Sequence, residues 1–284
     1  MNDKLKESEK VKEPDEGKST EEKIKLAKDP NISEKILEEL AEDPDREVRA
    51  WVGVNPNASE KILEELAKDE YWEVRAWVGV NPNASEKILE ELAKDPDGDV
   101  RAAVAENPNT RKEILEELAK DEYWEVRDAV AENPNTEEGV LDKLAKDPNN
   151  YVRKDVAKNP KTRKEILEEL AKDKGYENLW VREAVAKNPN TSEKILEELA
   201  KDEYSAVREA VAKNPKTRKE TLRELANDPD SGVRIAVTEN PNTEEGVLDK
   251  LANDPDNLVR MAASLRLQDM LERLLKELGN RIRS

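Results

Sequence analysis

Hydrophobic and polar positions follow one pattern that repeats every 26 residues along most of the chain. Each repeat begins with an apolar stripe at helical spacing, such as Val48 and Val52, and an Asn-Pro pair follows it. A second stripe comes after that pair, as in Ile62, Leu63 and Leu66. Because this spacing places apolar side chains on one helix face and proline interrupts helices, each repeat is expected to form two short helices.

The dipeptide Val-Arg marks the register of the repeats. Successive arginines are 26 residues apart, except for one interval of 29 that contains a three-residue insertion between Asp173 and Val181. The nine arginines are Arg49, Arg75, Arg101, Arg127, Arg153, Arg182, Arg208, Arg234 and Arg260. Such self-similarity predicts an all-α solenoid of about nine two-helix repeats without a sheet, in which each repeat needs its neighbours to complete a core.

Local signals predict where the helices begin. Asp43 before Pro44 is expected to be an N-cap, with the proline at the first helical position. Thr110 and Glu113 have the spacing of a capping box ahead of a second helix, as do the same residue types two and four repeats later.

The motif V-R-x-A-V-A-x-N-P-x-T-x-x-x-x-L-x-x-L-A-x-D-P-D is clearest in residues 100–121 and 207–230. It resembles the leucine-rich repeat variant family over roughly residues 30–263. The resemblance implies alternating α- and 3₁₀-helices wound into a right-handed superhelix. HEAT-like repeats are the second choice, since their longer units fit this period less well. One family member carries an iron–sulfur cluster on a cysteine segment, but this chain has no cysteine, so the resemblance implies architecture and binding.

The two ends depart from the repeat. Residues 1–20 are charged and lack an apolar stripe, so they are expected to be disordered, and residues 21–259 are expected to form the solenoid. Residues 260–284 predict an amphipathic helix with a net charge of +3 that caps the last repeat, and a dimer-forming coiled coil is the alternative. Its apolar stripe consists of Leu267, Leu271, Leu274, Leu278 and Ile282.

Composition argues against catalysis. The chain has no histidine and no cysteine, so common proton shuttles, the strongest nucleophile and the common transition-metal ligands are missing. The carboxylates recur at equivalent outward positions, whereas a reaction centre should occur once. We therefore expect no enzyme activity, no metal and no cofactor. A carboxylate-based enzyme is a remote alternative that a single buried Asp or Glu pair would support.

Charge restricts the partners. A net charge of −18 opposes binding to nucleic acid and favours a partner that is neutral or basic. No apolar run has the length of a signal peptide or a membrane span, so a cytoplasmic protein without membrane contact is expected. We interpret the arginine column as an internal ladder of ion pairs with aspartates of adjacent repeats.

Aromatic residues are the main departures from the repeat. Trp51 and Trp77 stand where other repeats have alanine, and a glycine follows each two residues later. For these two tryptophans, repacking of the early core is the favoured interpretation, with a binding groove as the alternative. Asp155 occupies the same position in its own repeat, so this position does not always hold an apolar side chain. For the aromatic turns, binding and burial are equally open. The candidate partner-binding residues are Tyr71, Trp72, Tyr123, Trp124, Trp51 and Trp77.

The sequence therefore predicts a non-catalytic scaffold that binds a protein or peptide through a variable aromatic surface. A structural or designed consensus-like array without a natural ligand is the alternative. The absence of Phe, His and Cys fits a constructed sequence, whereas the uneven insertion and reused blocks fit natural duplication.

Overall fold

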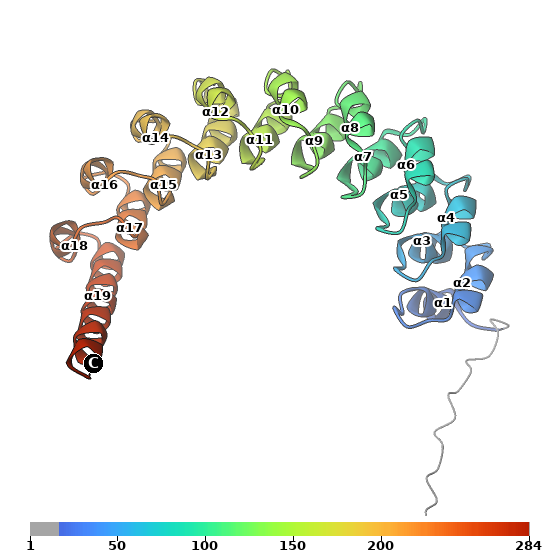
Figure 1. Cartoon of the computed structure of the whole chain (residues 1–284), viewed down its shortest axis with the longest axis horizontal. Coiled ribbons are helices and arrows are strands. Elements are labelled where there is room, and N and C mark those ends of the chain that lie inside the picture. Colours follow the sequence, from blue (N-terminus) through green and yellow to red (C-terminus); the bar gives the residue numbers. More distant parts are fainter. Residues whose placement is uncertain (1–16, 284) are drawn as a thin grey trace, which may run out of the picture. The chain divides into compact units, whose positions relative to one another are not determined.

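The computed structural model describes residues 17–283, and all regular elements in that range are helices (Figure 1). It divides into two compact blocks, an N-terminal block (residues 17–130) and a C-terminal block (residues 131–283). Within each block, odd-numbered helices form one row and even-numbered helices form another (Figure 1). The all-α repeat architecture predicted from the periodicity is thus confirmed.

The N-terminal block alternates first and second helices of each repeat. The helices are α1 (Thr20–Ala27), α2 (Glu34–Ala41), α3 (Arg46–Val54), α4 (Glu60–Leu66), α5 (Trp72–Val80), α6 (Glu86–Leu92), α7 (Gly98–Glu106), α8 (Lys112–Leu118) and α9 (Trp124–Glu132). Neighbouring odd-numbered helices such as α3, α5 and α7 pack directly against one another.

The C-terminal block continues the alternation. Its helices are α10 (Glu138–Leu144), α11 (Asn150–Lys158), α12 (Lys164–Leu170), the 3₁₀ helix η1 (Tyr176–Asn178), α13 (Leu179–Lys187), α14 (Glu193–Leu199), α15 (Ser205–Lys213), α16 (Lys219–Leu225), α17 (Ser231–Glu239), α18 (Glu245–Leu251) and α19 (Asn257–Arg283). The inserted residues form η1, and Gly175 before it has φ +94°, a left-handed conformation that glycine adopts at little cost.

The core is built from the two apolar stripes of every repeat. Val74 and Val78 of α5 are fully buried, and Ile88, Leu89 and Leu92 of α6 are 1% exposed. Because helices of seven to nine residues are unstable alone in water, their stability comes from this packing between neighbouring repeats.

The helix starts differ from the local signals in two ways. The N-cap of α3 is Asp45, whose side chain accepts a hydrogen bond from the Glu47 N–H at 2.9 Å. The prediction of Asp43 is wrong because Pro44 lies in the turn and not in the helix, and Asp43 accepts from the Asp45 N–H at 2.8 Å. The D-P-D turn therefore uses both aspartates.

The predicted capping boxes at the repeat threonines are also wrong. Thr110 lies before the N-cap Arg111, and its hydroxyl donates to the carbonyl of Val104 at 2.5 Å. The equivalent threonines Thr162 and Thr217 donate to the carbonyls six residues earlier in the same way. These buried hydroxyls satisfy last-turn carbonyls of the preceding helix, which have no partner within it.

The structure tests the predictions for the two chain ends only in part. Residues 1–16 of the segment expected to be disordered lie outside the described residues, and α1 begins at Thr20 after a capping box of Ser19 and Glu22. Helix α19 begins at Asn257 and packs on α17 and α18. Leu267 of its apolar stripe is half-buried and Leu271 is 57% exposed. The side chains of Leu274, Leu278 and Ile282 lie outside the described residues, so the capping role stays a prediction.

Candidate partner-binding surface

Guanidinium groups of the Val-Arg arginines join the turns of adjacent repeats. Arg75 donates from Nε and Nη2 to the two carboxylate oxygens of Asp95 at 2.7 and 2.9 Å. Its Nη1 donates to the carbonyl of Asp69 at 2.8 Å, in the turn that precedes α5. The side chains of Arg75 and Asp95 are 14% and 7% exposed, so this bidentate contact is largely withdrawn from water.

The same two-bond contact recurs along both blocks. The further pairs are Arg49–Asp69, Arg101–Asp121, Arg182–Asp202, Arg208–Asp228 and Arg234–Asp254. At the insertion, Arg153 donates to Asp173 and to the side-chain oxygen of Asn178, both at 2.7 Å. The inserted segment thus supplies a second acceptor, and the ladder continues through it.

The arginines of the column also hold carbonyls of their own turns. Arg127 donates from Nη1 to the carbonyl of Asp121, and Arg260 to that of Asp254, each at 2.7 Å. The arginines are therefore engaged within the protein and are not displayed to a polyanion. Their contribution to stability stays a prediction.

The ladder aspartates keep their charge. Burial disfavours the carboxylate of Asp228, but hydrogen bonds from Arg208 and the Asp230 N–H outweigh it and hold its pKa below the ordinary value. The pKa values of Asp69 and Asp121 are lowered in the same way. These carboxylates stay ionised until the pH falls well into the acid range.

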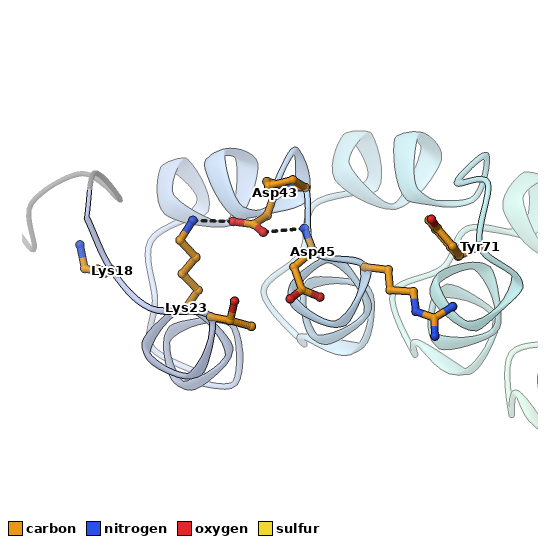
Figure 2. Close-up of a pocket in the computed structure, with 8 residues that line it drawn as sticks. Lys18, Lys23, Asp43, Asp45 and Tyr71 are labelled. Atoms are coloured by element: carbon orange, nitrogen blue, oxygen red, sulfur yellow. Dashed lines mark hydrogen bonds and ion pairs between the residues drawn. The ribbon is translucent and has the colours of Figure 1, made fainter.

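A lysine takes the place of the ladder arginine at the first repeat. Lys23 Nζ lies 2.7 Å from the Asp43 carboxylate, twenty residues away, which is the sequence separation of the Arg–Asp pairs. Figure 2 shows this pair in a shallow recess that Lys18 and Tyr71 also line. Lys23 and Asp43 are thus already paired with each other within this recess.

The Asn-Pro asparagines form a second set of contacts between repeats. Asn81 donates from Nδ2 to the carbonyls of Gly53 and Asn55 at 2.7 and 3.1 Å, and its Oδ1 accepts from the Asn83 N–H at 2.8 Å. Asn81 is fully buried, and Asn214 makes the equivalent bonds in the C-terminal block. The sequence indicated that the Asn-Pro pair separates two helices, and the bridge to the preceding repeat is a new finding.

The turn tyrosines cover ladder arginines. The Arg49 guanidinium lies 5.7 Å from the ring centre of Tyr71, and Arg101 lies 5.5 Å from that of Tyr123. Tyr71 is the N-cap residue of α5 and offers no side-chain cap, whereas Asp97 at the equivalent position caps α7. These cation–π contacts give the tyrosines a role in the stack as well as an exposed surface of 37% and 50%.

The two tryptophans within helices of the odd-numbered row, Trp51 of α3 and Trp77 of α5, stack on each other. The ring centres of Trp51 and Trp77 are 5.7 Å apart at an interplanar angle of 26°, and Lys28 Nζ lies 3.7 Å above the Trp51 ring. Trp51 is half-buried and Trp77 is 41% exposed. The favoured interpretation of a sealed core therefore does not describe Trp77, whose indole reaches the surface.

Aliphatic side chains extend this surface along α3 and α5. Val54, Ala76 and Val80 are each half-buried and lie within one helical turn of a tryptophan. We call the set Trp51, Val54, Ala76, Trp77 and Val80 the indole face. It is an apolar surface on the odd-numbered row of the N-terminal block.

The glycines that follow the tryptophans let the helices of this row come close. A Cβ on Gly53 would lie 3.3 Å from a methyl of Val78, and one on Gly79 would lie 3.2 Å from the Cβ of Ala103. The combination of tryptophan with glycine thus belongs to a locally tighter packing of α3, α5 and α7.

Exposed carboxylates border the indole face. Glu47 precedes Trp51 by four residues, and Asp99 and Glu106 lie on α7, beside Ala103. All three are exposed, and none forms an ion pair with a residue that the structure describes. The border is therefore acidic.

The remaining candidate residues lie at the ends of helices. Trp72 begins α5 and is 39% exposed, while Trp124 begins α9 and is half-buried. A further exposed aromatic pair in the C-terminal block, Tyr151 and Trp180, occupies equivalent positions of α11 and α13, each 51% exposed. The exposed aromatic residues are thus not confined to one place.

One fully buried carboxylate, Asp155, bears on the catalytic alternative, but it does not complete the buried pair that this alternative requires, because the neighbouring Glu132 is exposed. Asp155 has no exposed surface, and Lys154 Nζ and Lys158 Nζ lie 3.1 and 2.5 Å from its two oxygens. Burial raises the pKa of Glu132, and the negative charge of Asp155 and a hydrogen bond with it raise it further. Because lysines occupy both oxygens of a fully buried side chain, a substrate has no route to Asp155 in this arrangement.

The helices show no sign of a membrane span. Within residues 17–283, none combines the length and the apolar character needed to cross a bilayer.

These features define the class of the protein as an all-helical tandem-repeat solenoid. A family model of the leucine rich repeat variant matches residues 98–122, 124–149 and 206–230. A solved structure described as a leucine-rich repeat variant with a novel repetitive protein structural motif is 29% identical, with a TM-score of 0.58 over 80% of this chain and 88% of that chain. The resemblance inferred from the motif is therefore confirmed, and three of the repeats match the leucine rich repeat variant model directly.

Other solved structures are less similar. The X-ray structure of the Escherichia coli protein YIBA is 19% identical, with a TM-score of 0.46 over 88% of this chain and 98% of that chain. A designed armadillo repeat protein is 15% identical, with a TM-score of 0.23 over 83% of this chain and 99% of that chain. No curated protein matches this chain.

Proposed function

We propose that this helical repeat protein is a non-catalytic scaffold that binds a protein or peptide through the indole face. One observation carries the proposal. Trp77 is 41% exposed at a position where the same helix in other repeats holds a buried alanine such as Ala103 or Ala210. The fold therefore does not need an indole there.

An exposed apolar surface of this kind is costly without a partner. Indole rings that remain in water forgo a large part of the free energy that burial would provide, and clustered exposed aromatic residues are typical of binding surfaces. A purely structural array would be expected to keep the alanine that the C-terminal block has at Ala184 and Ala210.

The candidate residues do not contribute equally to this proposal. Tyr71 and Tyr123 lie against arginines of the ladder, so their conformations are already set by the stack. Trp72 continues the aromatic surface at the start of α5, and Trp124 is half-buried. We place the centre of the binding surface at Trp51 and Trp77 and its edge at Trp72.

The acidic border supports a neutral or basic partner. Glu47, Asp99 and Glu106 lie beside the indole face, and the whole chain has a net charge of −18. Both charges oppose an anionic partner such as nucleic acid.

The test is a selection from a random peptide display library. We expect the native chain to enrich a recognisable set of peptides and the variant Trp51→Ala/Trp77→Ala to lose that set, because alanine is native at these positions in other repeats. Trp180→Ala is the matched control, since Trp180 is 51% exposed and lies outside the indole face.

The outcomes separate the two functions. Circular dichroism would first establish that all three chains have the same helix content. If no peptide is enriched, or if the double variant enriches the same peptides as the native chain, the structural array without a ligand is the better description.

A further inference from the structure

We infer that the partner places a guanidinium or ammonium group on the open face of the Trp77 ring, so that the ligand is a peptide segment with an arginine or lysine next to an aliphatic residue. This inference rests on the proposed function and specifies its partner. Three observations support it: the stack around Trp77, the carboxylates that border the indole face, and the apolar side chains beside the ring. We call these apolar side chains, Val54, Ala76 and Val80, the apolar floor.

The stack at Trp51 and Trp77 is closed on one side. Lys28, at the end of α1, lies 3.7 Å above the Trp51 ring, and Trp77 of α5 stacks on that ring with a centre-to-centre distance of 5.7 Å. At the equivalent position of the next helix, α7, the side chain is Ala103, a single methyl group that is itself 7% exposed. Trp77 therefore has a neighbouring ring on one face and no large side chain in register on the other.

The molecule already pairs its aromatic rings with cations. Besides Lys28 on Trp51, Arg101 lies 5.5 Å from the Tyr123 ring and Arg182 lies 5.6 Å from the Tyr204 ring. Indole is the side chain that attracts cations most strongly, because its ring face is negative. A cation on Trp77 would complete a cation–indole–indole–cation stack.

The border favours a cation and disfavours an anion. Glu47 precedes Trp51 by four residues, and Asp99 and Glu106 lie on α7, the next helix of the row after α5. No ion pair with a described residue neutralises these three carboxylates. A cation above Trp77 would therefore meet both the ring and unpaired negative charge.

The apolar floor explains why we expect an aliphatic residue next to the arginine or lysine of the partner. Val54, Ala76 and Val80 are half-buried and offer a surface to methylene groups. Arginine and lysine carry aliphatic stems that pack on such surfaces while the charged group reaches a polar border. An adjacent aliphatic residue of the partner would cover what remains of the floor.

The probe is a short fluorescein-labelled peptide of alternating arginine and leucine, compared with the same peptide in which citrulline replaces arginine. Citrulline keeps the shape of the side chain and removes its charge. We expect the native chain to bind the arginine peptide about tenfold more tightly than the citrulline peptide, as measured by fluorescence anisotropy.

Trp77→Ala should weaken binding of the arginine peptide by about tenfold and should remove most of the preference over citrulline. Trp180→Ala should leave both affinities unchanged. Asp99→Asn/Glu106→Gln should weaken the arginine peptide and leave the citrulline peptide unaffected, and added salt should do the same.

Several results would overturn the inference. If Trp77→Ala weakens both peptides equally, the face binds apolar groups without a cation, and the proposed function survives alone. If the arginine preference persists in Trp77→Ala, the carboxylates and not the ring select the cation. If Trp77→Ala changes neither affinity, or neither peptide binds, the indole face is not a site for such peptides. A molecular mass that rises with concentration in the native chain but not in Trp77→Ala would assign the face to a second copy of the chain.

Discussion

The odd-numbered row has two different surfaces on one backbone. In the N-terminal block, α5 presents Ala76, Trp77 and Val80 at three neighbouring surface positions. In the C-terminal block, α13 has Glu183, Ala184 and Lys187 at the same three positions, and Ala184 is buried.

The charged surface of the C-terminal block needs no partner. Glu183 and Lys187 form an ion pair at 2.5 Å, and Glu209 and Lys213 of α15 form one at 2.6 Å, both at i, i+4 spacing. The apolar version leaves indoles exposed. The buried valines, the bridging asparagine and the ladder arginine are the same in both regions, so the repeat separates what holds the stack from what its surface offers. Substitutions at the shared scaffold positions and at the variable surface positions test these two roles separately.

The largest expected effect is the loss of a bridging asparagine. Asn81→Ala and Asn214→Ala should each lower the free energy of unfolding by roughly 2 to 4 kcal/mol, because buried carbonyls of the preceding repeat and one N–H lose their partner. Chemical denaturation followed by circular dichroism would measure both. If one block is sensitive and the other is not, the scaffold is not uniform and the comparison fails.

Asn109→Ala is the control for the asparagine variants. Its Nδ2 donates to the carbonyl of Pro82 at 2.7 Å in an exposed turn, so water can replace the bond. We expect a loss of less than about 1 kcal/mol.

The second effect concerns the ladder. Arg75→Ala and Arg208→Ala should each lower the free energy of unfolding by about 2 kcal/mol, because each removes the two guanidinium hydrogen bonds of a largely buried carboxylate. Lys87→Ala serves as the exposed control, since the Lys87–Glu64 pair has side-chain exposures of 76% and 38% and such pairs contribute little. Equal melting temperatures for Arg75→Ala and the native chain would show that the contacts do not stabilise the stack.

The ladder aspartates should give both blocks the same dependence of stability on pH. Lowered pKa values of Asp69 and Asp121 in one block and Asp228 in the other mean that the unfolded chain takes up these protons first. Their stabilising contribution is therefore complete above the unfolded value of about 3.9 and is lost as the pH falls through the folded values.

Glu132 has the opposite sign. Its raised pKa means that the folded state binds the proton more tightly, so its contribution favours folding at low pH and declines as the pH rises from about 4.3 through the folded value. Denaturation midpoints measured from about pH 3 to about pH 8 should show that Glu132→Gln no longer loses stability as the pH rises but still loses it in acid. If stability depends on pH in the same way in Glu132→Gln as in the native chain, Glu132 does not cause the decline at higher pH.

The sequence predicted the fold because periodicity is a property of the whole chain. Val-Arg, Asn-Pro and the apolar stripes recur in register, and their structural meaning follows from helix geometry. The bridging role of Asn81 was missed because its acceptors Gly53 and Asn55 lie one repeat earlier, and only stacking brings them close. Thr110 was misassigned for a related reason, since its hydroxyl serves the helix behind it.

The proposed binding surface was harder to predict than the fold. Trp51 and Trp77 are spaced like core residues, three residues after buried Val48 and Val74. A helix of nine residues that packs on both neighbours of its row has surface positions directly beside buried ones, and the sequence does not show on which side of that boundary an indole ring lies. Recurrence distinguishes them better than spacing does, because the valines recur in every repeat and the tryptophans do not.

The smallest expected effect concerns Asp155, the charged counterpart of Trp77. Asp155→Ala should leave the free energy of unfolding unchanged or raise it by up to about 1 kcal/mol, because it removes a fully buried charge and the repulsion of Glu132. Lys154 and Lys158, with 22% and 53% of their side chains exposed, can turn to water. Denaturation at neutral pH and an NMR titration of the Glu132 carboxyl would measure the two consequences, since the pKa of Glu132 should fall toward its ordinary value. A loss of more than about 2 kcal/mol would mean that the two lysine pairs hold α11 in place. Asp155 would then belong to the scaffold, and this position would not be one that the fold leaves open to variation.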